Sequence, residues 1–293
     1  MHKRTDFREN ADMTVLNSIR RFLLPLGLLC LALTWAAPGH AQMAPGFSVS
    51  IAPPPLPVYS EPPLPADGYI FIPGYWAWGG PNGFYWVPGT WVQPPAPGLL
   101  WTPGYWSVAA DGVSYVWQPG YWGPSVGFYG GVDYGFGYYG TGYDGGYWDS
   151  GFFFYNSRVH NFGHVRVAHS FAKAVPAVRS ARVSFTGAAR GGVDARPGPN
   201  EDAASHEQHA PAVDLQVQHE TKAATIRSAP VAVNHGRPPV AATQQPATFT
   251  GHGIVAARPV TSHPAPTRAS SPPPQSQSHG SPPPSQGDDR DHH

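Results

Sequence analysis

One phrase of six residues occurs four times between residues 71 and 122, and it constrains the fold more than any other feature of the chain. Each copy contains a leading aromatic residue, Pro-Gly and a final Trp, and the final Trp residues are 15, 15 and 16 positions apart. Eight of the ten Trp lie in this stretch, so the pattern is a true repeat. The motif residues, which form the candidate structural site, are Phe71, Gly74, Trp76, Trp86, Gly89, Trp91, Trp101, Gly104, Trp106, Trp117, Gly120 and Trp122.

The Pro-Gly step within each copy predicts a change of chain direction. Pro followed by Gly favours a type II turn in which the Gly has a positive φ. That turn has the wrong twist for a two-residue hairpin loop, so we interpret each Pro-Gly as a corner between two strand pieces. We expect the hairpin loops between the copies, in stretches rich in turn residues at 79–83, 93–98 and 109–112.

Aromatic residues alternate along the strand pieces, as in Trp76 and Trp78, which places such pairs on one face of a strand. The predicted fold class is therefore mostly β: a small antiparallel sheet or hairpin array built from the repeats, with short helices and long disordered tails. Cross-strand aromatic pairs, each contributing about 0.2–1 kcal/mol, would stabilise this sheet.

The rest of the chain offers less to bury, because 29 of the 38 aromatic residues lie between Tyr69 and Tyr155 and the chain holds 34 Gly and 36 Pro. We interpret the Gly/Tyr-rich segment either as an irregular hairpin beside the repeats or as a disordered tract. The predicted divisions are a signal peptide at 1–41, a Pro-rich extended linker at 42–67, the repeat domain at 68–123, the Gly/Tyr-rich segment at 124–156, a basic extended segment at 157–199, short helices at 200–228 and a disordered Pro/Ser/Gln-rich tail at 229–293.

The N-terminal region resembles a secretory signal. An apolar run at 22–37 follows two Arg and precedes small residues, which predicts cleavage after Ala41; an N-terminal anchor helix is the alternative. Translation from Met1 or from Met13 is compatible with this pattern. The single cysteine, Cys30, lies within the run, so the mature chain would have no disulfide and no cysteine-ligated metal.

Charge is sparse and unevenly distributed. Charged residues make up 12% of the chain and the formal net charge is zero, so the overall balance implies no strongly acidic or basic partner. The segment 157–197, however, carries seven Lys or Arg against the single acidic residue Asp194. It is interpreted either as a contact for phosphate-bearing lipopolysaccharide or another anionic polymer, or as a solvated face.

No arrangement of residues predicts catalysis. Between residues 68 and 156 the carboxylates are four Asp and there is no Glu, which gives no convincing acid–base pair. The G-x-G-x-x-G match at 135–140 is interpreted as chance, since Gly is frequent there and no apolar strand precedes it. His206, His209 and His219 match no metal-site spacing and are expected to be exposed. We therefore expect no enzyme, no cofactor and no metal.

The phrase Trp-x-Pro-Gly-Tyr-Trp resembles the bacterial WXXGXW, or YXWGXW, repeat family. Three copies keep both Trp and the Gly, and the first departs by having Phe71 in the leading position. The resemblance implies an exported protein of the periplasm or outer envelope of a Gram-negative bacterium, without family catalytic residues. The expected function is a non-enzymatic structural or interaction module. Carbohydrate binding, to peptidoglycan or lipopolysaccharide through exposed Trp and Tyr, is the alternative.

The expected partners follow from this location. They are an envelope polysaccharide or another envelope protein. Nucleic acid is not expected, because basic residues are absent among the aromatic ones. A membrane span in the mature chain is not expected either, because the Gly/Tyr-rich segment contains Asp133, Asp144 and Asp149.

Overall fold

The computed structural model describes residues 47–176 and 182–258. The predicted signal peptide, its cleavage at Ala41 and the last 35 residues of the predicted tail lie outside these ranges. The described residues belong to one compact unit. None of its helices is long and apolar enough to cross a membrane.

The first two copies of the phrase form one long hairpin. Its strands are β2 (Ile70–Ile72), β3 (Tyr75–Trp78), β4 (Phe84–Val87) and β5 (Gly89–Val92). The inner strands β3 and β4 pair antiparallel across the loop that holds η1 (Gly80–Asn82), and the outer strands β2 and β5 pair antiparallel farther from the loop. Each arm therefore changes direction once, at its Pro-Gly, as the sequence predicts.

The last two copies form a second hairpin of the same design. Its strands are β6 (Leu100–Thr102), β7 (Tyr105–Val108), β8 (Tyr115–Gln118) and β9 (Tyr121–Gly123), with β7 paired to β8 and β6 paired to β9. Residues 79–83 and 109–112 are hairpin loops, as predicted. Residues 93–98 are not, because β5 and β6 do not pair, and this stretch only connects the two hairpins.

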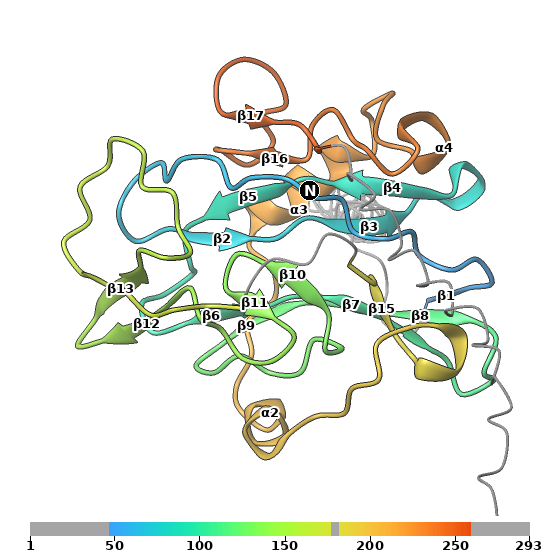
Figure 1. The fold of residues 1–293 in the computed structure, drawn as a ribbon, viewed down its shortest axis with the longest axis horizontal. Coiled ribbons are helices and arrows are strands. Elements are labelled where there is room, and N and C mark those ends of the chain that lie inside the picture. Colours follow the sequence, from blue (N-terminus) through green and yellow to red (C-terminus); the bar gives the residue numbers. More distant parts are fainter. Residues whose placement is uncertain (1–46, 177–181, 259–293) are drawn as a thin grey trace, which may run out of the picture. The chain divides into compact units, whose positions relative to one another are not determined.

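Short strands from distant parts of the chain widen both hairpins into four-stranded sheets (Figure 1). β16 (Ala242–Thr243) adds to β5 and carries β17 (Ile254–Val255) at its other edge. In the second hairpin, β1 (Ser48–Val49) pairs with β8, and β15 (Phe185–Thr186) pairs with β7. Added strands of this kind cover the edges that an isolated hairpin would leave unpaired.

The predicted boundaries at the two ends of the repeat unit are wrong. Residues 47–67 are not a free spacer, because Leu56, Tyr59 and Leu64 are buried in the core. The predicted disordered tail begins too early, since the described residues 229–258 include α4 (Val231–Asn234), β16 and β17. Both segments contain the small or apolar residues that the edges of the hairpins need, which composition alone does not show.

The Gly/Tyr-rich segment is an irregular hairpin region, the first of its two interpretations. β10 (Asp133–Gly135) pairs with β11 (Tyr138–Tyr139), and β12 (Gly146–Asp149) pairs with β13 (Phe152–Asn156). β14 (Ser170–Phe171) extends β13 in parallel. The segment packs beside the repeats, because Tyr138 is fully buried and its hydroxyl donates to the Trp101 carbonyl at 2.9 Å.

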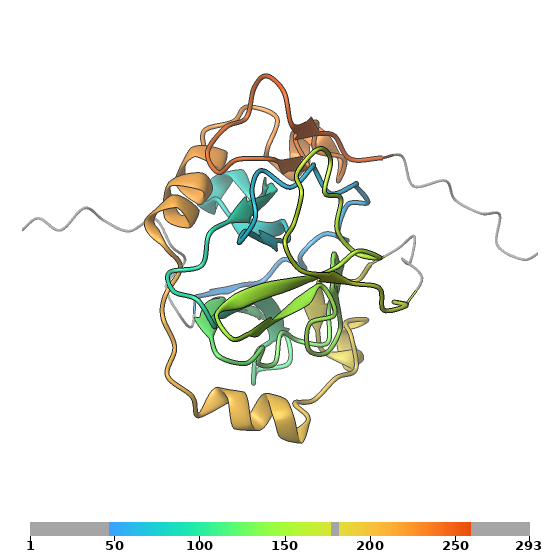
Figure 2. The same ribbon diagram turned by 90° about the vertical axis from the view of Figure 1, so that its left-hand side faces the viewer.

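Short helices follow close to the predicted positions. After η2 (Ala188–Arg190) come α2 (Pro199–Ser205) and α3 (Asp214–Ala223). In α2, the Glu201 carboxylate accepts the Gly198 N–H at 2.8 Å, which satisfies a backbone donor at the helix start. Figures 1 and 2 show α2 on the outer side of the second hairpin, whereas α3 lies against β4 of the first.

Candidate functional site

The glycines of the repeat are covered by aromatic rings from the other copy in the same hairpin. A Cβ added to Gly104 would lie 2.5 Å from Cζ2 of Trp117, and one added to Gly120 would lie 2.5 Å from Cζ2 of Trp101. In the first hairpin, Trp86 covers Gly74 and Phe71 covers Gly89 in the same way. The leading aromatic residue of each copy therefore fits only if the partner copy has a glycine.

This packing corrects the predicted role of the Pro-Gly step. None of the four motif glycines has a positive φ, so the corners are not type II turns. The glycines are required because each one lies close to the backbone of the opposite corner as well as to an aromatic ring. A Cβ on Gly120, for example, would lie 2.7 Å from the Gly104 nitrogen. The absence of a side chain, rather than a left-handed conformation, explains the glycine.

The final Trp of each copy also contacts the partner copy, because it lies directly opposite the leading aromatic residue of that copy. The facing pairs have ring centroids 5.0–5.4 Å apart in tilted or edge-to-face arrangements, which aromatic rings prefer. The pairs are Phe71 with Trp91, Trp76 with Trp86, Trp101 with Trp122, and Trp106 with Trp117.

The indole N–H groups attach the rest of the unit to this aromatic core. Trp76 and Trp91 donate to carbonyls of the N-terminal segment at 3.1 and 3.0 Å, and Trp86 donates to the Ala241 carbonyl at 3.0 Å. Trp106 donates to the Trp76 carbonyl at 2.8 Å and so joins the two hairpins. Seven of the eight repeat Trp are at most 7% exposed, and the eighth is half-buried. The motif residues are therefore core, not a ligand-binding platform.

A small cavity of about 60 Å3 lies where the Pro-Gly corners of both hairpins meet α3. Two adjacent residues of α3, His219 and Glu220, line it together with the ring of Tyr75, which stacks on Trp117 at 5.1 Å. Both α3 side chains are nearly inaccessible, at 2% and 6% exposure. This junction cavity is the place where titratable groups meet the repeat.

His219 is held in one neutral form. Its Nε2 is 2.7 Å from the Pro88 carbonyl oxygen and must donate there, whereas Nδ1 accepts the Ala247 N–H at 2.8 Å. Burial lowers the pKa of His219 to about 4, because the charged form loses its hydration. His219 therefore connects a repeat corner to the C-terminal segment. The expectation that it is exposed is wrong.

The pKa of Glu220 is shifted in the opposite direction. Burial raises its pKa from 4.5 to about 7, and a hydrogen bond with Tyr75 opposes that rise. Among the described residues, its Oε1 has no hydrogen-bond partner. A carboxyl group that changes charge near neutral pH therefore lies against the repeat corners, in a cavity too small for an organic substrate.

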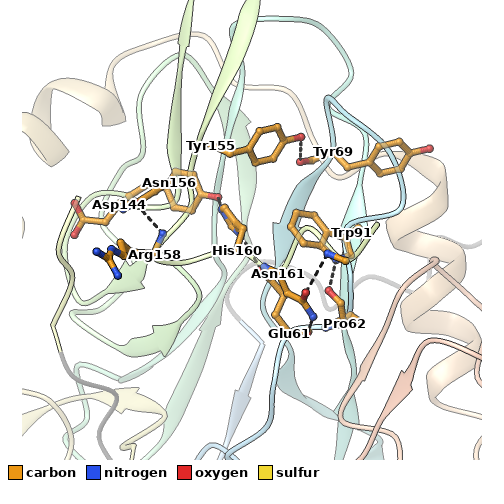
Figure 3. Close-up of polar contacts among 12 residues, drawn as sticks. Glu61, Pro62, Tyr69, Trp91, Asp144, Tyr155, Asn156, Arg158, His160 and Asn161 are labelled. Atoms are coloured by element: carbon orange, nitrogen blue, oxygen red, sulfur yellow. Dashed lines mark hydrogen bonds and ion pairs between the residues drawn. The ribbon is translucent and has the colours of Figure 1, made fainter. Parts of the chain in front are cut away.

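A second buried cluster has a carboxylate, an imidazole and a hydroxyl in series, and Figure 3 labels the first two, Glu61 and His160. Glu61 Oε1 is 2.9 Å from His160 Nδ1, and His160 Nε2 is 3.2 Å from the Tyr143 hydroxyl. The Glu61 and His160 side chains are 4% and 0% exposed, and His160 lies between the rings of Trp91 and Tyr155. Because both side chains are almost fully buried and hydrogen-bonded, the cluster holds the N-terminal segment against the core.

The two most exposed aromatic side chains of the described residues, Tyr147 and Phe152, lie on the sheet β12–β13–β14. Tyr147 stacks on Phe154 with centroids 5.2 Å apart and 6° between the planes, and Tyr147 also contacts Phe171. Tyr147 and Phe152 are 46% and 57% exposed. We call this surface the aromatic face; its members are Tyr147, Phe152, Phe154, His169 and Phe171.

A groove of about 250 Å3 adjoins the aromatic face. Its walls combine Trp148 and Phe152 with the polar side chains of Asp67, Gln93 and His169. The Trp148 ring is fixed, because its N–H donates to the Leu99 carbonyl at 2.9 Å. Sequence reasoning missed this site, since its parts come from segments that the sequence assigns to a linker, a loop and a Gly-rich tract.

The other predicted groups are dispersed. The His209 ring stacks on Tyr121 at 3.8 Å, and the buried His219 lies in a different environment. Across residues 47–176 and 182–258, no three His, Cys, Asp or Glu side chains lie together as a metal site. Among the described Lys and Arg residues of the segment 157–199, Arg182 is 3% exposed and the others are exposed.

Two β-hairpins, each of which covers its own glycine corners with aromatic rings from its two arms, share one Trp core and define a hairpin-repeat protein. A family model, the WXXGXW repeat, matches at residues 67–92 and 97–122, and each match corresponds to one whole hairpin. The repeat region therefore belongs to the WXXGXW repeat family. Neither a curated protein nor a solved structure matches the chain.

Proposed function

We propose that the protein is a non-enzymatic interaction module exported to the envelope of a Gram-negative bacterium. The observation that carries this proposal is the burial of the repeat Trp, which makes the repeat a scaffold for other surfaces. The apolar run before Ala41 supports export. Subcellular fractionation together with N-terminal sequencing of the protein from cells tests the location, and a cytoplasmic protein with an intact N-terminus would contradict it.

Polysaccharide binding is the second candidate, through the aromatic face and its groove instead of the repeat Trp. Contiguous exposed aromatic rings mark interaction surfaces in soluble proteins. A groove with aromatic walls and a few polar groups is the usual form of a small-ligand site. Tyr147 and Phe152 supply flat apolar area, and Asp67 and Gln93 supply hydrogen-bonding groups for hydroxyls.

Co-sedimentation with purified peptidoglycan and a binding assay with lipopolysaccharide test this candidate. The double variant Tyr147→Ser/Phe152→Ser should abolish binding, because it removes the exposed rings without opening the core. Leu215→Ser is the matched control, since Leu215 is 51% exposed on α3, on a different element. Binding that survives the double variant, or a protein that binds neither polymer, would refute the carbohydrate proposal.

A further inference from the structure

A cavity of about 290 Å3 lies between the N-terminal segment, the β10–β11 turn and the basic segment. It is separate from the aromatic groove and from the junction cavity, with which it shares no lining residue. Two arginines line it, Arg158 and Arg182, and its only acidic lining residue is Glu61. Glu61 is already committed to His160 and to the Asn161 N–H, so the cavity has an excess of positive charge.

Arg182 is the unusual member of this cavity. Its guanidinium donates to the carbonyls of Tyr134 and Pro57 at 2.6 and 3.1 Å, and within the described part of the chain its Nε has no hydrogen-bond partner. The ion pairs formed within residues 47–176 and 182–258 are Glu61–His160 and Lys173–Asp144, so neither gives Arg182 a carboxylate. A cation that is 97% buried beside neutral carbonyls keeps most of its desolvation penalty, which a bound anion would offset.

The surroundings hold Arg182 in position and add an apolar wall. Gly135 leaves room for the guanidinium, since a Cβ there would lie 2.7 Å from Nη1 of Arg182. The next residue, Phe136, has a φ of 54°, and this left-handed backbone presents its ring to Tyr59 at 4.9 Å. Arg258 contacts the Ser60 hydroxyl at the rim, which brings a third guanidinium near the cavity.

We propose that this cavity binds a phosphate group, as a phosphomonoester whose small organic part contacts the wall of Tyr59, Phe136 and Tyr139. Planar guanidinium groups match the oxygens of phosphate and donate charge-assisted hydrogen bonds. Two lining arginines and a third at the rim match the double negative charge of a phosphate better than the single charge of a carboxylate. The inference does not depend on export or on the aromatic groove.

Isothermal titration calorimetry at low ionic strength tests the proposal with inorganic phosphate, glucose 1-phosphate and glucuronate as probes. Both phosphates should bind, glucose 1-phosphate more tightly, and both more tightly than glucuronate. Arg158→Gln should weaken phosphate binding about tenfold, the loss expected for one charge-assisted hydrogen bond. Arg190→Gln is the matched control, because Arg190 is exposed on η2 outside the cavity and its loss should leave affinity unchanged.

A measurement on the unaltered protein removes any dependence on the folding of variants. Phosphate should shift the Nε–H NMR signals of Arg158 and Arg182 and leave that of Arg190 in place. The proposal is overturned if neither phosphate binds, if glucuronate binds as tightly as the phosphates, or if the Arg158 and Arg190 variants lose affinity equally. If neither phosphate binds, Arg182 is a structural connector between three backbone segments; if glucuronate binds as tightly, the cavity does not select phosphate.

Discussion

Replacing Glu220 by Gln should stabilise the protein at alkaline pH, although it alters a buried polar group beside the repeat. The folded state raises the pKa of Glu220 from 4.5 to about 7. Each pKa unit corresponds to about 1.36 kcal/mol, so the ionised carboxylate lowers the free energy of unfolding by about 3 kcal/mol. Gln keeps the shape of the protonated acid and cannot ionise.

The sign of the effect depends on pH. Below pH 4.5 the carboxyl is protonated in both the folded and the unfolded chain, and it imposes no penalty. Between pH 4.5 and 7 the unfolded chain ionises first, so the contribution of Glu220 to the free energy of unfolding falls as the pH rises. The buried His219 acts in the opposite direction over part of this range, and the comparison of the native protein with Glu220→Gln cancels it. Above pH 7 the penalty is complete and constant. The advantage of Glu220→Gln over the native protein should therefore grow by about 3 kcal/mol between pH 4.5 and 8.

Urea unfolding at several pH values between 4.5 and 8, followed by Trp fluorescence, measures this difference directly. Asp214→Asn is the matched control, because Asp214 begins the same helix but is exposed. Its effect should be a few tenths of a kcal/mol, from the helix dipole, without the growth between pH 4.5 and 8. A pH-independent difference for Glu220→Gln, or a variant that is less stable than the native protein at pH 8, would refute the reasoning.

Three further predictions concern the core. Gly104→Ala should lower the free energy of unfolding by at least about 1–3 kcal/mol, because the new Cβ would lie 2.5 Å from the Trp117 ring. Gly198→Ala is the control and should cost less in the same urea titration, because its Cβ would have its nearest neighbour at 3.6 Å. Burial lowers the pKa of His219 to about 4, so the free energy of unfolding of the native protein should fall by about 3 kcal/mol relative to that of His219→Gln as the pH falls from 6.5 to 4; this comparison cancels the contribution of Glu220, which both proteins share. Trp emission should be blue-shifted and poorly quenched by acrylamide, because seven of the eight repeat Trp are buried; strong quenching would show that the hairpins do not pack as described.

The repeat allowed the strands, the corners and two of the three loops to be predicted from sequence. Periodicity places Trp76 and Trp86 on strands, and the turn-rich residues between the copies locate the hairpin loops. The reason for the glycines could not be predicted, because a type II turn and a close approach both favour Pro-Gly in sequence. The backbone angles of the glycines and the position of Trp117 over Gly104 distinguish the two.

The candidate sites were less predictable than the fold. Arg182 and Pro57 are 125 residues apart, and nothing in their local sequence indicates that the guanidinium donates to that carbonyl. The same holds for His219 and Pro88, which are 131 residues apart. Contacts of this kind depend on how weakly patterned segments wrap around the hairpins, and the sequence assigned those segments to a linker, a basic extended segment and short helices.

The mutual covering of the glycine corners has a consequence for how such chains lengthen or shorten. No copy of the phrase covers its own glycine, but each copy supplies the aromatic ring that covers the glycine of its partner. The packing of the corners is therefore complete only when copies occur in pairs. Loss of one copy would leave the remaining copy of that hairpin with an uncovered glycine and an aromatic ring without its partner glycine. A second molecule with the same deletion would restore both contacts if the two molecules paired their remaining hairpin arms. Duplication of whole hairpins preserves a monomer, whereas an odd number of copies favours a swapped dimer.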